Sequence, residues 1–216
     1  CDKQTRHFLI ETLKVKDTDI YSIQGPIDLT FFTKFAGLNG CEQLCFEPII
    51  PVYPPADFFE HKNVFDAIKE KDRMLHHPYE SFKCVVDFVR QAAEDENVLA
   101  IKQTLYRVSG NSPIVAALIK AAENGKQVTV LVELKARFDE ENNILWAKKL
   151  EEAGCHVIYG LVGLKTHCKI LLVVRREEDG IRRYVHMGTG NYNDSTAKIY
   201  TDISLFTCKE PYGMDA

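Results

Sequence analysis

The sequence predicts an α/β fold in which a mostly parallel sheet is flanked by helices. Short apolar runs rich in β-branched residues alternate with segments of helical periodicity, and short connections containing turn residues separate them. In such a sheet, ligands bind at the edge where the parallel strands present their carboxyl ends. The residues that directly follow the strands are therefore the first candidates for a functional site.

The expected helices and strands alternate from about residue 81 onward. Ser81 is the expected N-cap of a first helix, whose apolar positions recur with a helical period: Phe82, Val85, Val86, Val89, Ala92 and Ala93. Ser112-Pro113 supplies an N-cap and a first-turn proline for a second helix, which Gly125 ends. A third helix covers 142–153 and ends at Gly154. The expected strands are 98–106, 127–134, 155–159, 169–175, 182–187 and 202–207.

The composition is that of an ordinary globular chain, with 45% hydrophobic and 27% charged residues among 216. A net charge of −4 argues against a general nucleic-acid coat, so an anion site must come from a local cluster. No apolar run is long enough for a transmembrane helix, and the opening residues lack the apolar core of a signal peptide. We therefore expect a cytoplasmic protein. The proline-rich stretch 49–55 is the expected boundary between segments 1–50 and 51–216.

Cationic and imidazole side chains follow several of the expected strands. They are Arg107, Lys135, Arg137, Lys165, His167 and His186. Guanidinium groups match phosphate oxygens in a bidentate manner and lysine acts as a point charge, so their convergence would make a phosphate site. Taken singly, each arginine is more simply a surface residue paired with a carboxylate, and each histidine a structural group.

The segment His167-Cys168-Lys169 is followed by the turn Gly188-Thr189-Gly190-Asn191. A neutral imidazole is a nucleophile for phosphorus, and a lysine on the same strand face stabilises the phosphoryl oxygens. The turn adds backbone and side-chain donors. This pattern favours phosphoryl transfer through a histidine.

These residues resemble half of a phospholipase D-type active site, and longer segments resemble bacterial polyphosphate kinase. The segments are Lys102-Gln-Thr-Leu-Tyr-Arg107, Glu133-Leu-Lys-Ala-Arg-Phe-Asp139, Gly163-Leu-Lys-Thr-His-Cys-Lys169 and Tyr184-Val-His-Met-Gly-Thr-Gly-Asn-Tyr-Asn193. The resemblance implies that segment 51–216 is most of a first phospholipase-D-like catalytic domain and that 1–50 is the end of a head domain. Position 174 is a valine, whereas full phospholipase D motifs have an acidic residue there.

The resemblance also implies roles for individual residues. His167 would accept the γ-phosphoryl group of ATP and pass it reversibly to polyphosphate, and His186 would support the site. Lys169 and Asn191 would stabilise the phosphoryl oxygens. Lys165 would bind ATP.

Three further residues are implied to bind the substrates. Tyr200 would contact the nucleotide. Arg107 and Arg137 would form the phosphate and magnesium site. A guanidinium offers only donors, so we expect both arginines to clamp oxygens that Mg²⁺ also touches rather than to ligate the metal.

The family's proteins are longer, and their second phospholipase-D-like half carries a general-acid histidine. We therefore expect weak phosphorylation and little turnover from this chain alone, since general acid–base catalysis is worth about 10²–10⁴-fold. The implied partners are ATP, ADP and polyphosphate, and the resemblance implies a full-length homo-oligomer and leaves open a peripheral membrane association. Two alternatives stay open: a non-catalytic phosphate-binding or assembly module, and a phosphodiesterase half-site of the phospholipase D type.

Overall fold

The computed structural model describes residues 2–25, 27–28, 30, 35, 37–55, 58, 63–135, 140–160 and 163–216. The chain divides into two compact units, Cys1–Pro48 and Ile49–Ala216. In the first unit, the described residues form helix α1 (Lys3–Leu13) and short 3-10 turns at Asp17–Asp19 and Glu42–Leu44. Asp2 caps α1 by accepting a hydrogen bond from the Thr5 backbone N–H at 2.8 Å. No α1 residue is buried, so this helix depends on its cap and its own hydrogen bonds.

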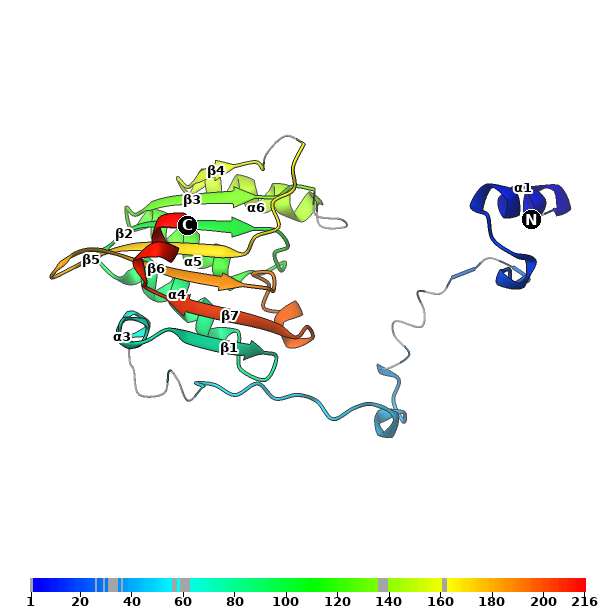
Figure 1. The fold of residues 1–216 in the computed structure, drawn as a ribbon, viewed down its shortest axis with the longest axis horizontal. Coiled ribbons are helices and arrows are strands. Elements are labelled where there is room, and N and C mark those ends of the chain that lie inside the picture. The colour runs from blue at the N-terminus through cyan, green and yellow to red at the C-terminus, as the bar shows by residue number, and fades with distance from the viewer. Residues whose placement is uncertain are drawn as a thin grey trace. The chain divides into compact units, whose positions relative to one another are not determined.

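The second unit builds one seven-stranded sheet with helices packed on it (Figure 1). Its elements in chain order are α3 (Val64–Glu70), β1 (Arg73–His77), α4 (Lys83–Glu94), β2 (Val98–Leu105), α5 (Pro113–Glu123), β3 (Gln127–Val132), α6 (Glu140–Glu152), β4 (His156–Ile158), β5 (Ile170–Glu177), β6 (Gly180–Gly188), η4 (Thr196–Lys198), β7 (Asp202–Thr207) and α7 (Glu210–Asp215).

The strand order is β1-β7-β6-β5-β2-β3-β4, and the sheet is mixed. Strands β2, β3 and β4 pair in parallel, as expected, but the remaining pairings are antiparallel. The α/β class is confirmed, whereas the expectation of a mostly parallel sheet is corrected. For the β5–β6 pair the cause is the connection: Glu177 pairs with Gly180, which leaves a two-residue hairpin and no room for a crossover helix.

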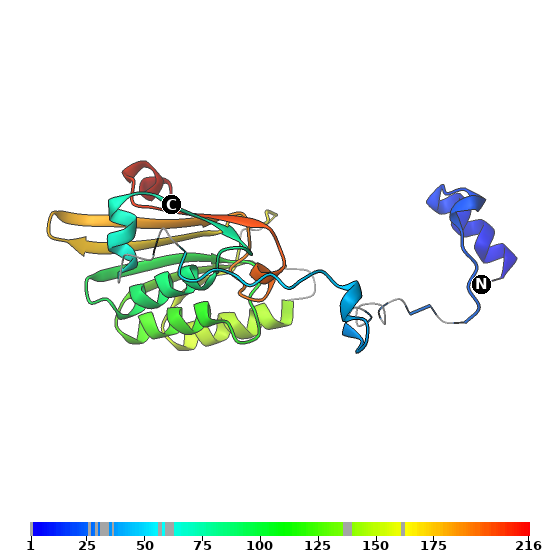
Figure 2. The same ribbon diagram turned by 90° about the horizontal axis from the view of Figure 1, so that it is seen from below.

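Helices α4, α5 and α6 cover one face of the sheet, and α7 lies on the other (Figure 2). The buried stripe of α4 includes Val85, Val89 and Ala92, at the predicted helical spacing. These residues belong to one core with inward-facing strand residues such as Ile101 and Leu171. Burial of this helical face fixes the strands whose ends carry the site.

Local signals place the helix ends well. Ser112 caps α5 by accepting a hydrogen bond from Val115 N–H at 3.3 Å, and Pro113 is its first residue. Gly125 and Gly154 follow α5 and α6 at φ +79° and +89°, a conformation that favours glycine. The predicted cap of α4 is wrong by one residue: the helix begins at Lys83 and its N-cap is Phe82, not Ser81, although Ser81 Oγ accepts a hydrogen bond from Lys83 N–H at 3.2 Å. None of the helices formed by described residues is long and apolar enough to cross a membrane.

Candidate functional site

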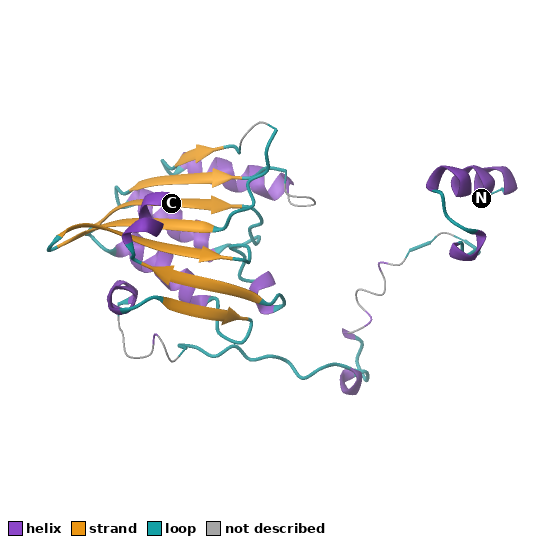
Figure 3. Cartoon of the chain, in the orientation of Figure 1, coloured by secondary structure: helices purple, strands orange, loops and turns teal. Residues whose placement is uncertain are grey.

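The predicted cationic residues follow strands that end at one edge of the sheet. Arg107 follows β2, Lys135 follows β3, and the chain returns from β4 through Lys165 to the start of β5. Figure 3 shows the loops after β2 and β3 on the same side as the segment entering β5. The parallel β2–β3–β4 order therefore brings these three connections together.

Two buried polar residues tie these connections to one another. Asn143 of α6 donates through Nδ2 to the backbone oxygens of Tyr106 (2.7 Å) and Glu133 (2.9 Å). The Glu133 carboxylate in turn accepts from the backbone N–H of Lys135 at 3.0 Å and of Thr166 at 2.8 Å. Since both side chains are buried, these bonds are shielded from water and hold the segment before His167 in place.

The residues that follow His167 anchor its segment beside β2. The Thr104 hydroxyl donates to the Cys168 backbone oxygen at 2.8 Å and accepts from Ile170 N–H at 3.1 Å. His167 is exposed, whereas Lys169 is only 7% exposed. Lys169 Nζ donates to the His167 backbone oxygen at 2.6 Å. The imidazole is thus open to a solvent-borne substrate while its neighbouring cation is held by the protein.

The ring of Tyr106 is the common neighbour of the predicted site residues. The His167 ring packs edge-on against it, with centroids 5.3 Å apart and planes at 77°. Lys165 Nζ, Lys169 Nζ and Arg107 Cζ lie 4.9, 5.6 and 5.8 Å from its centroid. The structure therefore brings four of the predicted residues together around a tyrosine that the sequence analysis did not select.

The charges around His167 favour its neutral form. The Lys169 ammonium, partial burial and the Lys165 ammonium together hold the pKa of His167 below its ordinary 6.5. At neutral pH the ring therefore keeps a free lone pair, as a nucleophile requires.

His186 lies in β6, paired with Leu171 of β5, and is only 1% exposed. Its Nδ1 is hydrogen-bonded to the Tyr192 hydroxyl at 2.8 Å. Within the described part of the chain, neither His186 Nε2 nor Asn191 Oδ1 has a hydrogen-bond partner, and both residues line one small cavity. The structure thus places His186 and Asn191 beside each other and places His186 inside the protein.

The turn that carries Asn191 is held against β7. Thr189 Oγ1 donates to Asp202 Oδ1 at 2.8 Å and accepts from Ile203 N–H at 2.9 Å. A Cβ at Gly190 would lie 2.4 Å from Asp202 Oδ2, so only glycine fits without moving that carboxylate. Close approach therefore explains the glycine in this turn.

Burial lowers the pKa of His186 to about 3, which predicts a pH-dependent stability. Because the unfolded ring has its ordinary pKa near 6.5, the contribution of His186 is complete above that pH. It is lost as pH falls towards about 3, at about 1.4 kcal/mol per pH unit. His186→Gln is expected to flatten the dependence of the unfolding free energy on pH over this range. The parts due to His77, whose pKa burial also lowers, and to carboxylates with a lowered pKa such as Glu177 remain. Urea unfolding between pH 4 and 7 measures this pH dependence.

His156→Gln is the matched control for this prediction, because it removes a histidine from an exposed position on β4. A His186→Gln variant that kept the full pH dependence of the unaltered chain would contradict the assignment.

The remaining predicted residues differ in their exposure to solvent. Arg107 is half-buried and Lys165 is exposed. Tyr200 is 60% exposed and lies just before β7. Arg137 lies outside the described residues. Of the two arginines expected to clamp phosphate oxygens, the structure therefore places only Arg107, beside the Tyr106 ring.

The sequence analysis missed Tyr106, Glu133, Asn143 and Tyr192. Asn143 carried a usable signal, because it occupies the same helical stripe as the buried Ala147 and Leu150, where a polar residue needs partners. Tyr106 lies directly after β2 and before Arg107, and the sequence pattern assigns it to the expected strand 98–106.

The described residues do not themselves offer a metal site. No group of three or more His, Cys, Asp or Glu side chains among them is placed to hold a metal ion. Arg107, assigned to the magnesium site by resemblance, has no lone pair for a metal. The site's donors suit phosphate oxygens rather than Mg²⁺ itself.

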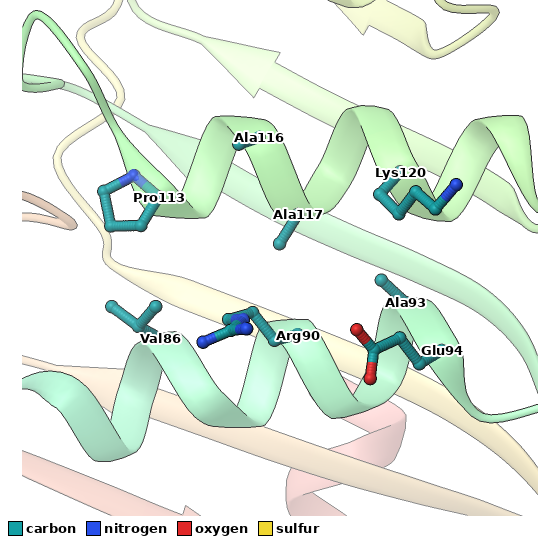
Figure 4. Close-up of a pocket in the computed structure, with 8 residues that line it drawn as sticks. All are labelled: Val86, Arg90, Ala93, Glu94, Pro113, Ala116, Ala117 and Lys120. Carbon is teal, nitrogen blue, oxygen red and sulfur yellow. The ribbon is translucent and has the colours of Figure 1, made fainter.

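One surface cavity adjoins the edge of the sheet that carries the cationic residues, and another lies away from it. One, of about 430 Å³, is lined by Glu133, Lys135, Tyr159 and Lys165 among others, so it adjoins the cationic group. The other, of about 270 Å³, lies between α4 and α5 and contains Arg90, Glu94 and Lys120 (Figure 4). It includes none of the predicted site residues.

Comparisons with known proteins show the family of this chain. The family model "Polyphosphate kinase C-terminal domain 1" matches residues 63–216. Polyphosphate kinase of Halalkalibacterium halodurans is 61% identical over 217 residues, covering 100% of this chain and 31% of the relative. That of Bacillus cereus is 59% identical over 219 residues, again covering 100% of this chain and 31% of the relative. The chain thus spans about a third of the length of these curated relatives.

Solved structures give the same result. Polyphosphate kinase from Porphyromonas gingivalis superposes with a TM-score of 0.72 at 32% identity, covering 93% of this chain and 33% of that one. A phospholipase D family member, Nuc from Salmonella typhimurium, superposes with a TM-score of 0.50 at 15% identity, covering 66% and 85%, which shows a shared fold. The family model and the relatives together show that the chain belongs to the polyphosphate kinase family.

Proposed function

We propose that this chain takes the γ-phosphoryl group of ATP onto His167 and passes it, reversibly, to inorganic polyphosphate. The observation that supports the proposal is an exposed imidazole whose pKa is lowered by two nearby ammonium groups, which are groups able to bind phosphate oxygens. Such surroundings favour attack on an anionic phosphoryl group.

In the proposed step, a ring nitrogen of His167 forms a bond to the γ-phosphorus as the bond from that phosphorus to the bridging β–γ oxygen breaks. ADP leaves with the electron pair of the broken bond. Lys169, Lys165 and Arg107 offset the charge on the transferring oxygens and on the leaving oxygen. In the second step, a terminal oxygen of polyphosphate attacks the phosphohistidine and regenerates the free ring.

His186 and Asn191 have supporting roles in this proposal. A buried, neutral His186 does not exchange protons readily with solvent, so we assign it to holding the turn that carries Asn191. Tyr200, exposed before β7, is the proposed nucleotide contact, and Arg137 the proposed second clamp. Mg²⁺ would arrive on the phosphate oxygens of ATP.

Labelled ATP and Mg²⁺ test the proposal on the purified chain. The expected product is a chain carrying acid-labile, base-stable label at position 167, because phosphohistidine has an N–P bond. His167→Gln is expected to reduce the label to background, whereas His156→Gln, at an exposed histidine of β4, leaves it unchanged. Turnover to long polyphosphate is expected to stay far below the rate of the longer relatives.

Other outcomes would favour the alternatives. Polyphosphate binding that is unaffected by His167→Gln, without any label, would point to a phosphate-binding module. Hydrolysis of a phosphodiester would point to a phospholipase D-type half-site. Label on another residue would refute the role of His167.

A further inference from the structure

The Tyr106 ring lies at the centre of the cationic group. His167 meets it edge-on at 5.3 Å, and Lys165 Nζ and Lys169 Nζ lie 4.9 and 5.6 Å from its centroid. Aromatic rings attract cations through their negative faces, and edge-to-face ring pairs attract each other as well. These attractions offset the mutual repulsion of two ammonium groups held close together.

The backbone of Tyr106 is held in place by buried residues. Its backbone oxygen accepts a hydrogen bond from Asn143, which is 0% exposed and also binds the Glu133 backbone. The Glu133 carboxylate binds Thr166 N–H, one residue before His167. The ring and the segment it meets are therefore positioned by the same buried pair of residues.

We propose that Tyr106 is a positioning residue for the phosphoryl transfer: its ring orients the His167 imidazole and gathers Lys165 and Lys169 beside it. This inference rests on the proposed function and adds a residue to it. Only the ring is needed for these contacts, so phenylalanine should serve in place of tyrosine.

The charges around His167 give the proposal a second consequence. Among the described residues, the charged groups that act on it are Lys165 and Lys169 on its own segment. From the end of β2, the Tyr106 ring packs against it, and Arg107 lies 5.8 Å from the centroid of that ring. Both lysines lower the pKa of His167. Without the ring, Lys165, which is exposed, is free to move into solvent, and its effect on the imidazole falls.

Tyr106→Leu and Tyr106→Phe, compared in the full 216-residue chain, test the inference. An NMR titration of the His167 ring without ATP or metal is expected to show a higher pKa, closer to 6.5, in Tyr106→Leu, and no change in Tyr106→Phe. The initial rate of labelling from ATP is expected to fall on the order of 10–100-fold in Tyr106→Leu, the cost of a misplaced reactant, and to be preserved in Tyr106→Phe.

One measurement uses the unaltered chain and needs no substitution. In the unaltered chain, the ring protons of His167 are expected to carry a ring-current shift from Tyr106, and its absence overturns the inference. So does a folded Tyr106→Leu chain with an unchanged His167 pKa and labelling rate. Absence of label on the unaltered chain would refute the proposed function, whereas the pKa and ring-current readouts still decide the placement of His167 by Tyr106.

Discussion

Lys169→Met is expected to slow labelling of His167 by about 10²–10³-fold, the usual cost of removing one preorganised group that stabilises developing charge. Lys169 is 7% exposed, and its ammonium is fixed by the His167 backbone oxygen and the Tyr106 ring. It therefore offers positive charge to the transferring oxygens without having to be ordered first. Methionine fills a similar volume but removes the charge and the hydrogen bond to the His167 backbone oxygen.

The same substitution is expected to change the pH dependence of labelling. Lys169 is the largest cause of the lowered pKa of His167. In Lys169→Met the pKa rises towards 6.5, so the rate falls off at a higher pH on the acid side than in the unaltered chain. Initial rates of labelling between pH 5 and 8 measure both effects.

Lys120→Met is the matched control, because Lys120 is an exposed residue of α5 that pairs with Glu123. Its rate and pH profile should follow those of the unaltered chain. Equal rates in Lys169→Met and Lys120→Met would remove Lys169 from the proposed mechanism.

Arg175→Met is expected to lower the free energy of unfolding by up to about 3 kcal/mol, the lower end of the cost of breaking a buried ion pair from one side, because this pair is only partly buried. Arg175 Nε lies 2.9 Å from Asp95 Oδ2, and Nη1 lies 2.6 Å from Glu177 Oε1. These three side chains are 14%, 15% and 8% exposed. Removal of the guanidinium leaves two carboxylates close together and largely out of water.

The loss should depend on pH in a defined direction. Hydrogen bonds from the Tyr184 hydroxyl and Arg175 outweigh burial and lower the pKa of Glu177. Its paired carboxylate therefore adds stability above the ordinary carboxyl pKa, and this stability is lost as pH falls through the lowered value. The gap between Arg175→Met and the unaltered chain is expected to narrow in acid.

Urea unfolding at pH 7 measures this difference, as a lower midpoint with an unchanged slope. Arg176→Met, at the exposed neighbouring position, is the control and is expected to lie within about 0.5 kcal/mol of the unaltered chain. A loss in Arg175→Met no larger than that would show that the pair stabilises nothing.

The sequence predicted the local parts of this fold well. The cap at Ser112, the helix ends at Gly125 and Gly154, and the strand Asp202–Thr207 are where their side chains and periodicity indicated. These features depend on residues within one or two turns of each other. The candidate residues also follow strand ends as expected, because the end of an apolar run in the sequence predicts the end of the strand.

The sequence did not predict where β5 would lie. It pairs with β2, some 70 residues earlier, and with β6, and this places the His167 segment beside Tyr106. Strand pairing over such a distance is selected by the packing of the whole sheet, and a period of two along each strand is compatible with several neighbours.

By itself, the sequence determined the alternation of helices and strands, the helix ends and the positions of the cationic residues along the chain, because each depends on neighbours in sequence. Only the tertiary structure decided that His167 is exposed among cations while His186 is enclosed and neutral. Two chemically identical rings differ in this way because burial and nearby charge come from distant segments, which the fold brings together.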